Sequence, residues 1–174
     1  WNPETITRLG IHLIPEEGGI FKTLTVEENL QLGAYHYFQH YHRQFEFVIQ
    51  LFPFLKKRVN QIAGTLSGGE QRILSFARAL MSPAQILMID EPSLGLSPKY
   101  MTQIFETIQA LNQQGYTILL AEQNITQALK YVQKVYILEN GQIIHQGKAD
   151  EIKNYPGIRE AYLGEVNISR EAEI

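Results

Sequence analysis

The chain of 174 residues is 44% apolar and 19% charged, with a formal net charge of -3 and an isoelectric point near 6.0. This composition is typical of a globular domain with one substantial core, and it gives no electrostatic reason to expect nucleic acid as a partner. The chain contains no cysteine, which excludes disulfides and thiolate metal sites, and no apolar run approaches the roughly 18 residues that a membrane-spanning helix needs.

The first 28 residues predict a short helix, a strand and the start of a longer helix. Residues 3–8 are typical of a helix, and the apolar residues 11–14 of a brief strand. The loop after this strand contains Glu16, which taken alone is an ordinary solvated acid. Residues 25–28 read Thr-Val-Glu-Glu and form a capping box, so we expect a helix to begin at Val26.

The region from residue 26 to 81 predicts a mainly helical insertion between two strands. Aromatic residues and three histidines crowd residues 35–42, but no carboxylate or cysteine lies there at ligand spacing, so aromatic packing and partner contact are favoured over a metal site. Apolar residues then recur with the spacing of one buried helical face, which Pro53 ends. These residues are Phe45, Val48, Ile49 and Phe52.

Residues 66–72 read Leu-Ser-Gly-Gly-Glu-Gln-Arg and stand ahead of an apolar pattern with helical spacing. Ser67, Gly68 and Gly69 therefore present a hydroxyl and bare backbone N–H groups at a helix N-terminus. Such a terminus attracts anions, because its N–H groups lack intrahelical acceptors and the helix dipole points outward.

Residues 86–89 are an apolar run typical of a buried parallel strand, which ends in Asp90 and Glu91. Ligands of open α/β sheets bind at this carboxyl edge. Taken singly, Ser-Gly-Gly is also compatible with an ordinary loop and Asp-Glu with an ordinary helix cap. The two features in this order and at this spacing are far more specific than either short motif alone.

The remaining chain predicts a helix, a strand and a hairpin. Ser97 and Pro98 open a helix, and residues 116–121 form another buried strand that is followed by Gln123. After a helix over residues 125–132, two alternating apolar runs flank an Asn-Gly dipeptide, which is the strongest short-range hairpin signal. We expect a pair of helices in the tail, over residues 150–162.

Leu-Ser-Gly-Gly-Glu-Gln-Arg followed by a strand ending in Asp-Glu-Pro resembles the signature and Walker B motifs of ABC-type ATPases. The resemblance covers essentially the whole chain and implies an α/β fold, a P-loop NTPase core with a mostly parallel sheet and a helical subdomain. Within a partial ATP-binding domain of residues 1–174, residues 1–25 and 82–150 would form the core, residues 26–81 the helical subdomain with the signature helix, and residues 151–174 the C-terminal tail.

The same resemblance implies roles for the motif residues. Asp90 would hold Mg²⁺ through a water molecule, and Glu91 would be the general base that polarises the attacking water. The signature would clamp the γ-phosphate of ATP bound by the opposite subunit of a head-to-tail dimer. Its residues in this chain are Ser67, Gly68, Gly69 and Glu70.

Three positions depart from the usual family pattern, and one of them is Ser97, which lies where most relatives have the D-loop aspartate that communicates across a dimer. Glu16 lies where the family has the Q-loop glutamine, which reaches the metal and the nucleophilic water. Gln123 lies where the family has the H-loop histidine, and glutamine can donate a hydrogen bond to phosphate but cannot carry a proton near neutral pH. Pro-Glu at residues 15–16 and Glu-Gln-Asn at residues 122–124 resemble the ATPases of branched-chain amino-acid importers.

That branch implies ATP and Mg²⁺ as cofactors, a second ATPase subunit and a membrane permease as partners, and a cytoplasmic location on the inner face of the plasma membrane. The chain contains no G-x-x-x-x-G-K-[ST] motif, the Walker A loop that cradles the phosphates. The family places this loop before the Q-loop, so we expect it ahead of Trp1 and expect this chain alone to be inactive.

Two alternatives remain. The first is a non-catalytic fragment or remnant that acts only as an interaction module. The second is a soluble ABC ATPase of translation or repair, which is disfavoured because those proteins resemble twin cassettes or carry coiled-coil insertions. The family also places the Walker A strand between the strands expected at residues 117–121 and 135–139, so these two strands should not pair with each other.

Overall fold

The structure, a computed structural model, describes residues 1–16 and 18–155. It divides the chain into two compact units, Trp1–Glu122 and Gln123–Ile174. The first unit contains the sheet, the helical region, the Ser-Gly-Gly motif at residues 67–69 and the strand end at Asp90 and Glu91.

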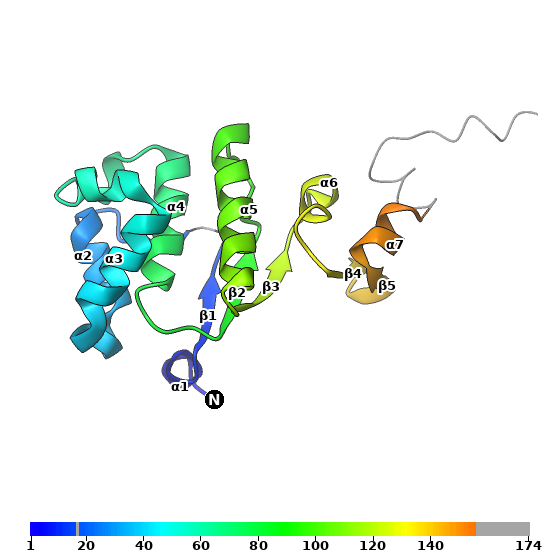
Figure 1. Cartoon of the computed structure of the whole chain (residues 1–174), viewed down its shortest axis with the longest axis horizontal. Helices are drawn as coiled ribbons and strands as arrows, with labels where there is room; N and C mark the ends of the chain where they lie inside the picture. The colour runs from blue at the N-terminus through cyan, green and yellow to red at the C-terminus, as the bar shows by residue number, and fades with distance from the viewer. Residues whose placement is uncertain (17, 156–174) are drawn as a thin grey trace, which may run out of the picture. The chain divides into compact units, whose positions relative to one another are not determined.

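Three parallel strands form the sheet of the first unit, in the order β1–β2–β3 (Figure 1). They are β1 (Ile11–Ile14), β2 (Ile86–Asp90) and β3 (Thr117–Ala121). Each apolar run of the sequence therefore became a strand, as predicted. Because the strands are parallel, their carboxyl ends meet at one edge of the sheet, and that edge carries the residues that follow β1, β2 and β3.

The regular elements between β1 and β2 are helical throughout the described part of that region. The capping box of Thr25 and Glu28 starts the helix at Val26, as predicted. The aromatic segment is a 3₁₀-helix, and the next helix ends just before Pro53. In chain order these elements are α2 (Val26–Gly33), η1 (Tyr35–His40), α3 (Tyr41–Leu51), η2 (Pro53–Arg58), η3 (Ala63–Thr65) and α4 (Gly68–Ala79).

Two further helices complete the first unit. Helix α1 (Pro3–Arg8) is capped by Asn2, whose Oδ1 accepts the N–H of Thr5 at 2.8 Å. Helix α5 (Pro98–Gln113) has Ser97 at its N-cap and a proline at its first position, as predicted. The chain turns after α5 at Gly115, whose φ of 97° is readily adopted by glycine.

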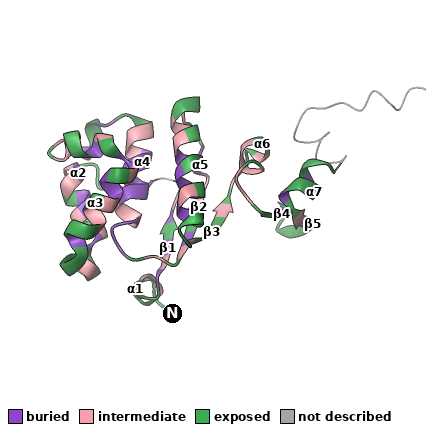
Figure 2. Cartoon of the chain, viewed as in Figure 1, coloured by how far each residue is buried: buried purple, intermediate pink, exposed green. Residues whose placement is uncertain are grey.

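The buried residues of the first unit lie along the sheet, on helices α4 and α5, and in the helical region between β1 and β2 (Figure 2). Helix α4 contacts β1, and α5 contacts β3. Side chains alternate along each strand, and one face of the sheet is buried. The largest fully buried side chains are Phe52, Phe76, Phe105, Ile14, Leu30, Leu55, Ile73, Leu74, Leu80, Met81, Leu87 and Ile89.

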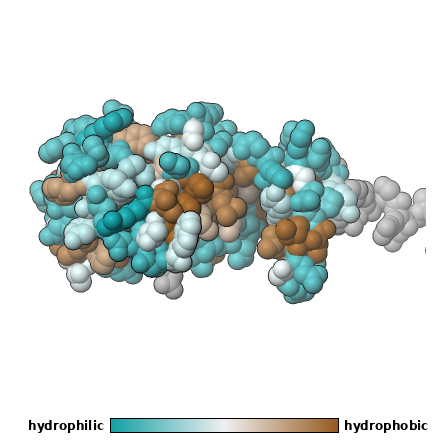
Figure 3. Space-filling model, turned by 90° about the horizontal axis from the view of Figure 1, so that it is seen from below, coloured by the Kyte–Doolittle hydropathy of each residue, from teal (hydrophilic) through white to brown (hydrophobic). Residues whose placement is uncertain are grey.

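The opposite face of the sheet exposes apolar side chains. Leu13 pairs with Met88 and Met88 with Leu119, so the three residues form one row across the strands. They are 60%, 37% and 57% exposed, respectively. Figure 3 shows that hydrophobic residues also gather at the surface of the chain. The described helices of the first unit therefore cover one face of the sheet, whereas parallel sheets are normally covered on both.

The described residues of the second unit form a short helix, a hairpin and a second helix. They are α6 (Ile125–Ala128), β4 (Lys134–Glu139), β5 (Gln142–Lys148) and α7 (Ala149–Lys153). The hairpin turns at Asn140 and Gly141, which have φ of 48° and 79°, so the predicted Asn-Gly turn is confirmed.

Helix α6 is shorter than the predicted range of 125–132, because its chain continues as turns in which the N–H groups of Lys130 and Tyr131 bond three residues back. Strand β4 pairs with β5, and β3 pairs with β2, within the described residues. Strand β3 belongs to the first unit and β4 to the second, so the expected absence of a β3–β4 pair stays a prediction. Of the predicted helix pair over 150–162, the first helix is α7 and the second lies outside the described residues.

Candidate functional site at the carboxyl edge of the sheet

Strand β2 delivers Asp90 and Glu91 to the carboxyl edge of the sheet, as the sequence predicted. Asp90 is the last residue of the strand, and Glu91 has a φ of 45°, a left-handed conformation that is uncommon for residues other than glycine. The N–H of Glu91 donates to the carbonyl of Ala121 at 2.9 Å. Such a backbone costs about 1 to 3 kcal/mol and persists only where its surroundings hold it.

Arg72 joins this strand end to the loop after β1. It lies on α4 and is only 6% exposed. Its Nη1 donates to the carbonyls of Pro15, at 2.7 Å, and Glu16, and its Nη2 donates to the carbonyls of Asp90 at 2.7 Å and Glu91 at 2.6 Å. One guanidinium thus gathers three residues that the sequence proposed for the site: Glu16, Asp90 and Glu91.

The charges around Arg72 are mainly negative. Burial lowers the pKa of its guanidinium, and Coulombic attraction to four carboxylates acts in the opposite direction. These carboxylates belong to Glu16, Asp90, Glu122 and Glu91. Arginine stays protonated in proteins, so a single buried cation lies among four acids, and the site has an excess of negative charge.

This donor set fits Mg²⁺, a hard cation that takes oxygen ligands and is usually held by one or two carboxylates together with substrate phosphates and water. Across residues 1–16 and 18–155, the structure gathers no group of three or more histidines, cysteines, aspartates or glutamates able to hold a metal ion. The acids of this edge therefore suit a cation shared with a phosphate ligand rather than one caged by protein alone.

Glu122 anchors the loop that follows Glu91. Its carboxylate accepts the hydroxyl of Ser93 at 2.8 Å and the N–H of Ser93 at 3.3 Å, and Ser93 is buried. This contact ties the segment after β2 to the end of β3. Sequence analysis assigned no role to Ser93 or Glu122, because only the pairing of β2 with β3 brings them together.

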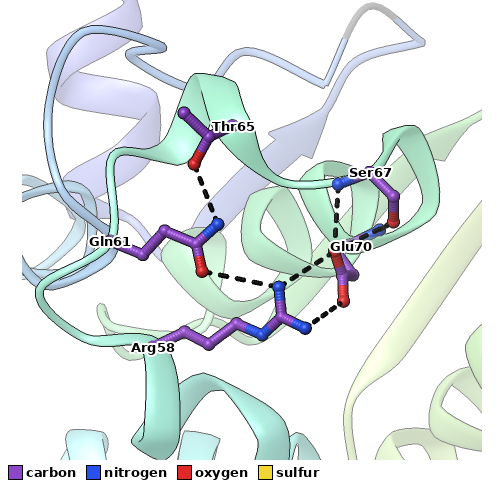
Figure 4. A network of polar contacts seen from close by, with 5 residues as sticks. All are labelled: Arg58, Gln61, Thr65, Ser67 and Glu70. Atoms are coloured by element: carbon purple, nitrogen blue, oxygen red, sulfur yellow. Dashed lines mark hydrogen bonds and ion pairs between the residues drawn. The ribbon is translucent and has the colours of Figure 1, made fainter.

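The signature turn, residues 67–70, is held by a capping box at the start of α4. Ser67 is the N-cap, its Oγ accepts the N–H of Glu70 at 3.4 Å, and its own N–H donates to Glu70 Oε2 at 2.9 Å. The carboxylate of Glu70 also pairs with Arg58 at 3.2 Å, in a network that includes Gln61 and Thr65 (Figure 4).

This network decides which groups of the turn are left for a ligand. Glu70 is occupied by the cap, and Arg58 offsets its charge. The N–H groups of Gly68 and Gly69 belong to the first turn of α4, where no intrahelical acceptor exists. The predicted anion-binding groups are therefore the two glycine amides and the exposed Ser67, with Glu70 holding their geometry.

Tyr100 of α5 closes one side of the signature turn. A Cβ atom added at Gly69 would lie 2.7 Å from Cγ and 2.9 Å from Cε2 of the Tyr100 ring, whereas a Cβ at Gly68 would meet no atom within 4 Å. Gly69 is thus required for close packing, and Gly68 is not. No sequence motif indicated the role of Tyr100, because the contact depends on how α5 crosses α4.

Gln123 is an exposed residue of the second unit, where its backbone carbonyl accepts the N–H of Ile125 at 2.9 Å. Its predicted contact with phosphate stays a prediction. No helix among the described residues is both long and apolar enough to span a bilayer.

Known proteins are similar to this chain in sequence and in fold. The family described as "ABC transporter" matches residues 2–94. The chain is 47% identical over 161 residues to the high-affinity branched-chain amino acid transport ATP-binding protein BraG of Pseudomonas aeruginosa, covering 92% of this chain and 69% of BraG. It is 38% identical over 167 residues to the probable branched-chain amino acid transport ATP-binding protein LivF of Archaeoglobus fulgidus, covering 95% and 71%.

Solved structures give the same result. An ATP-binding cassette of an ABC transporter in its ADP conformation matches with a TM-score of 0.75 at 28% identity, over 95% of this chain and 72% of that one. The ATP-binding subunit of an ABC transporter matches with a TM-score of 0.76 at 30% identity, over 94% of this chain and 68% of that one.

Proposed function

Because the chain belongs to the ATP-binding subunits of ABC transporters, we propose that it powers the import of branched-chain or related amino acids. The 47% identity to BraG supports this substrate class, as do Pro-Glu after β1 and Glu-Gln-Asn after β3. The observation that best supports ATP hydrolysis is the joint fixation of Glu16, Asp90 and Glu91 at one sheet edge by Arg72.

Each acid of this edge has a proposed role. Glu91 is the general base, because its constrained backbone fixes the position from which its side chain extends at the carboxyl edge of the sheet. Asp90 holds Mg²⁺ through a water, and Glu16 contributes a second acid where the family has glutamine. Mg²⁺, when bound, neutralises charge on the phosphates. Gln123 donates a hydrogen bond to phosphate without transferring a proton.

The signature turn acts in a head-to-tail dimer. Ser67 and the amides of Gly68 and Gly69 bind the γ-phosphate of ATP held by the second subunit, and the cap formed by Glu70 keeps them in place. A helix N-terminus with free amides suits this task, because both its donors and its dipole favour an anion.

The permease contacts the hollow beside α2. Leu24, Glu28, Gln31, Leu32, Tyr35 and Phe38 line this hollow. Tyr35 and Phe38 are 73% and 58% exposed, and aromatic side chains of this kind anchor protein interfaces. Since the family works with membrane permeases, we assign the hollow to the cytoplasmic surface of the permease, which places the subunit on the inner face of the plasma membrane.

ATP hydrolysis by the complete ATPase tests the function. We define the complete ATPase as this chain joined to a Walker A-containing segment placed ahead of Trp1. It should release phosphate from ATP, and the Glu91→Gln variant should not. The chain alone should release none, since each lost charge-assisted phosphate contact weakens binding by about 1.5 to 3 kcal/mol. Phosphate release by the chain alone, abolished by Glu91→Gln, would show that Walker A is dispensable.

A further inference from the structure

We propose that Arg72 is a positioning residue for ATP hydrolysis, which it serves by fixing the backbone of Glu91 relative to the loop of Glu16 and to the signature helix. The inference rests on the proposed function and adds a residue to it. Arg72 contacts the loops through their backbone, so its action on the chemistry passes through Glu91.

The geometry requires a guanidinium. Strands β1 and β2 are neighbours in the sheet, so the carbonyls that follow them lie about one strand spacing apart, roughly 4.8 Å. The two terminal nitrogens of Arg72 divide between the two loops, Nη1 toward Pro15 and Glu16 and Nη2 toward Asp90 and Glu91. Lysine carries a compact point charge and lacks this planar fork, so it cannot serve both loops in the same way.

The backbone of Glu91 is held from both sides. Its N–H donates to the carbonyl of Ala121 of β3, and its own carbonyl accepts from Arg72 at 2.6 Å and from the N–H of Leu94 at the longer distance of 3.3 Å. Its φ of 45° is unfavourable for glutamate, so the conformation persists because these contacts hold it. Loss of the Arg72 contact removes the shorter hydrogen bond to this carbonyl and leaves the 3.3 Å bond from Leu94. The peptide after Glu91 can then shift toward an ordinary conformation, which would turn the carboxylate away from its position.

Arg72 also links the signature turn to Glu91. It lies five residues after Ser67 on one continuous helix, a distance of roughly 7.5 Å along the axis. A helix transmits displacement as a rigid body, so a phosphate bound at the signature turn and the carboxylate of Glu91 are joined through α4 and one buried side chain. In a head-to-tail dimer these two groups serve different ATP molecules, so Arg72 is placed to couple the two sites.

Arg78 provides a matched control. It lies on the same helix, burial also lowers the pKa of its guanidinium, and that group stacks over the Phe21 ring at 5.3 Å. It serves no carbonyl at the carboxyl edge of the sheet among the hydrogen bonds of the described residues. Replacing Arg78 by lysine therefore removes a partly buried guanidinium from the same helix without releasing Glu91.

The experiment compares kcat and KM for ATP in the complete ATPase and in Arg72→Lys, Arg72→Gln and Arg78→Lys. Both Arg72 variants should lose roughly 30- to 100-fold in kcat, the effect of misplacing a reacting group by about 1 Å, with KM within about threefold. Arg78→Lys should change neither constant by more than about twofold. In the Glu91→Gln background, Arg72→Lys should cause little further loss, because both changes act on the same group.

Three outcomes separate the possibilities. Absence of hydrolysis by the unaltered complete ATPase refutes the proposed function itself. Normal hydrolysis by Arg72→Lys or Arg72→Gln refutes only the positioning role. A fall in the stoichiometry of bound nucleotide that parallels the fall in kcat in both variants also overturns it, because this pattern marks loss of folded protein rather than a misplaced base.

Discussion

Tyr100 packs its ring against the backbone of Gly69, so closely that no side chain fits at position 69. This contact joins α5, which follows the Asp90-Glu91 strand end, to the turn that binds phosphate in the proposed dimer. The neighbouring Gly68 faces open space. The two glycines of one motif are therefore under different constraints, and a pair of substitutions separates them.

Gly69→Ala should destabilise the complete ATPase by about 1 to 3 kcal/mol, the usual cost of overpacking. Gly68→Ala should be neutral or stabilise it by up to about 1 kcal/mol, because alanine is the better helix former. Urea unfolding measures both changes. A second substitution, Tyr100→Ala, should remove the penalty at position 69. Equal effects of the two alanines would contradict the packing seen here.

Glu91→Gln in the complete ATPase should lower turnover by about a hundredfold or more, the usual contribution of a general base, while ATP binding persists, because the amide keeps the shape of the side chain. Gln123→Ala should cost less, since only a positioning hydrogen bond is lost. Single-turnover hydrolysis together with equilibrium nucleotide binding measures both. If the two variants lose turnover equally, the assignment of the base is wrong.

Tyr35→Ser and Phe38→Ser should release the complete ATPase from membranes that contain the permease, because each removes exposed apolar area from the hollow beside α2. Hydrolysis without the permease should stay unchanged. Tyr136→Ser is the control, since Tyr136 is also aromatic and is 44% exposed but does not line the hollow. Membrane sedimentation reads out the result, and retention of both hollow variants on the membrane would remove this surface from consideration.

The capping box of α2 should make stability depend on pH. Hydrogen bonds from the Thr25 backbone and side chain lower the pKa of Glu28 below its ordinary value of 4.5. A carboxylate whose pKa is depressed by folding stabilises the fold above its unfolded pKa, and that contribution is lost as pH falls through the folded pKa. Glu28→Gln should therefore flatten the decline in the free energy of unfolding below pH 4.5, and Glu27→Gln should flatten it less. Identical acid profiles for Glu28→Gln and the unaltered protein would refute this role.

Local signals in the sequence predicted most elements of the fold. The apolar runs gave β1, β2 and β3, the capping box gave the start of α2, and the Asn-Gly dipeptide gave the hairpin. Each signal depends on a few adjacent residues. No local signal indicated that Glu16 would meet Asp90, and that expectation came from the resemblance to ABC-type ATPases.

The contacts that hold the site could not be predicted in this way. Arg72 reaches carbonyls 56 and 57 residues earlier in the chain and 18 and 19 residues later, and Tyr100 meets Gly69 only because α5 crosses α4. Such contacts depend on how elements cross in space. The one available clue was an arginine set within the apolar pattern of α4, where a charged residue is buried only if it has partners.

The exposed row of Leu13, Met88 and Leu119 makes the free energy of unfolding of the first unit depend on the concentration of any element that binds this face. An element that binds this face in the folded state and not in the unfolded chain raises the free energy of unfolding by RT ln(1 + [L]/Kd). Covalent joining of that element replaces its free concentration by an effective one, often in the millimolar range for short linkers. The midpoint of unfolding should thus depend on concentration when the covering element is a separate chain, and become independent of it when the two are joined.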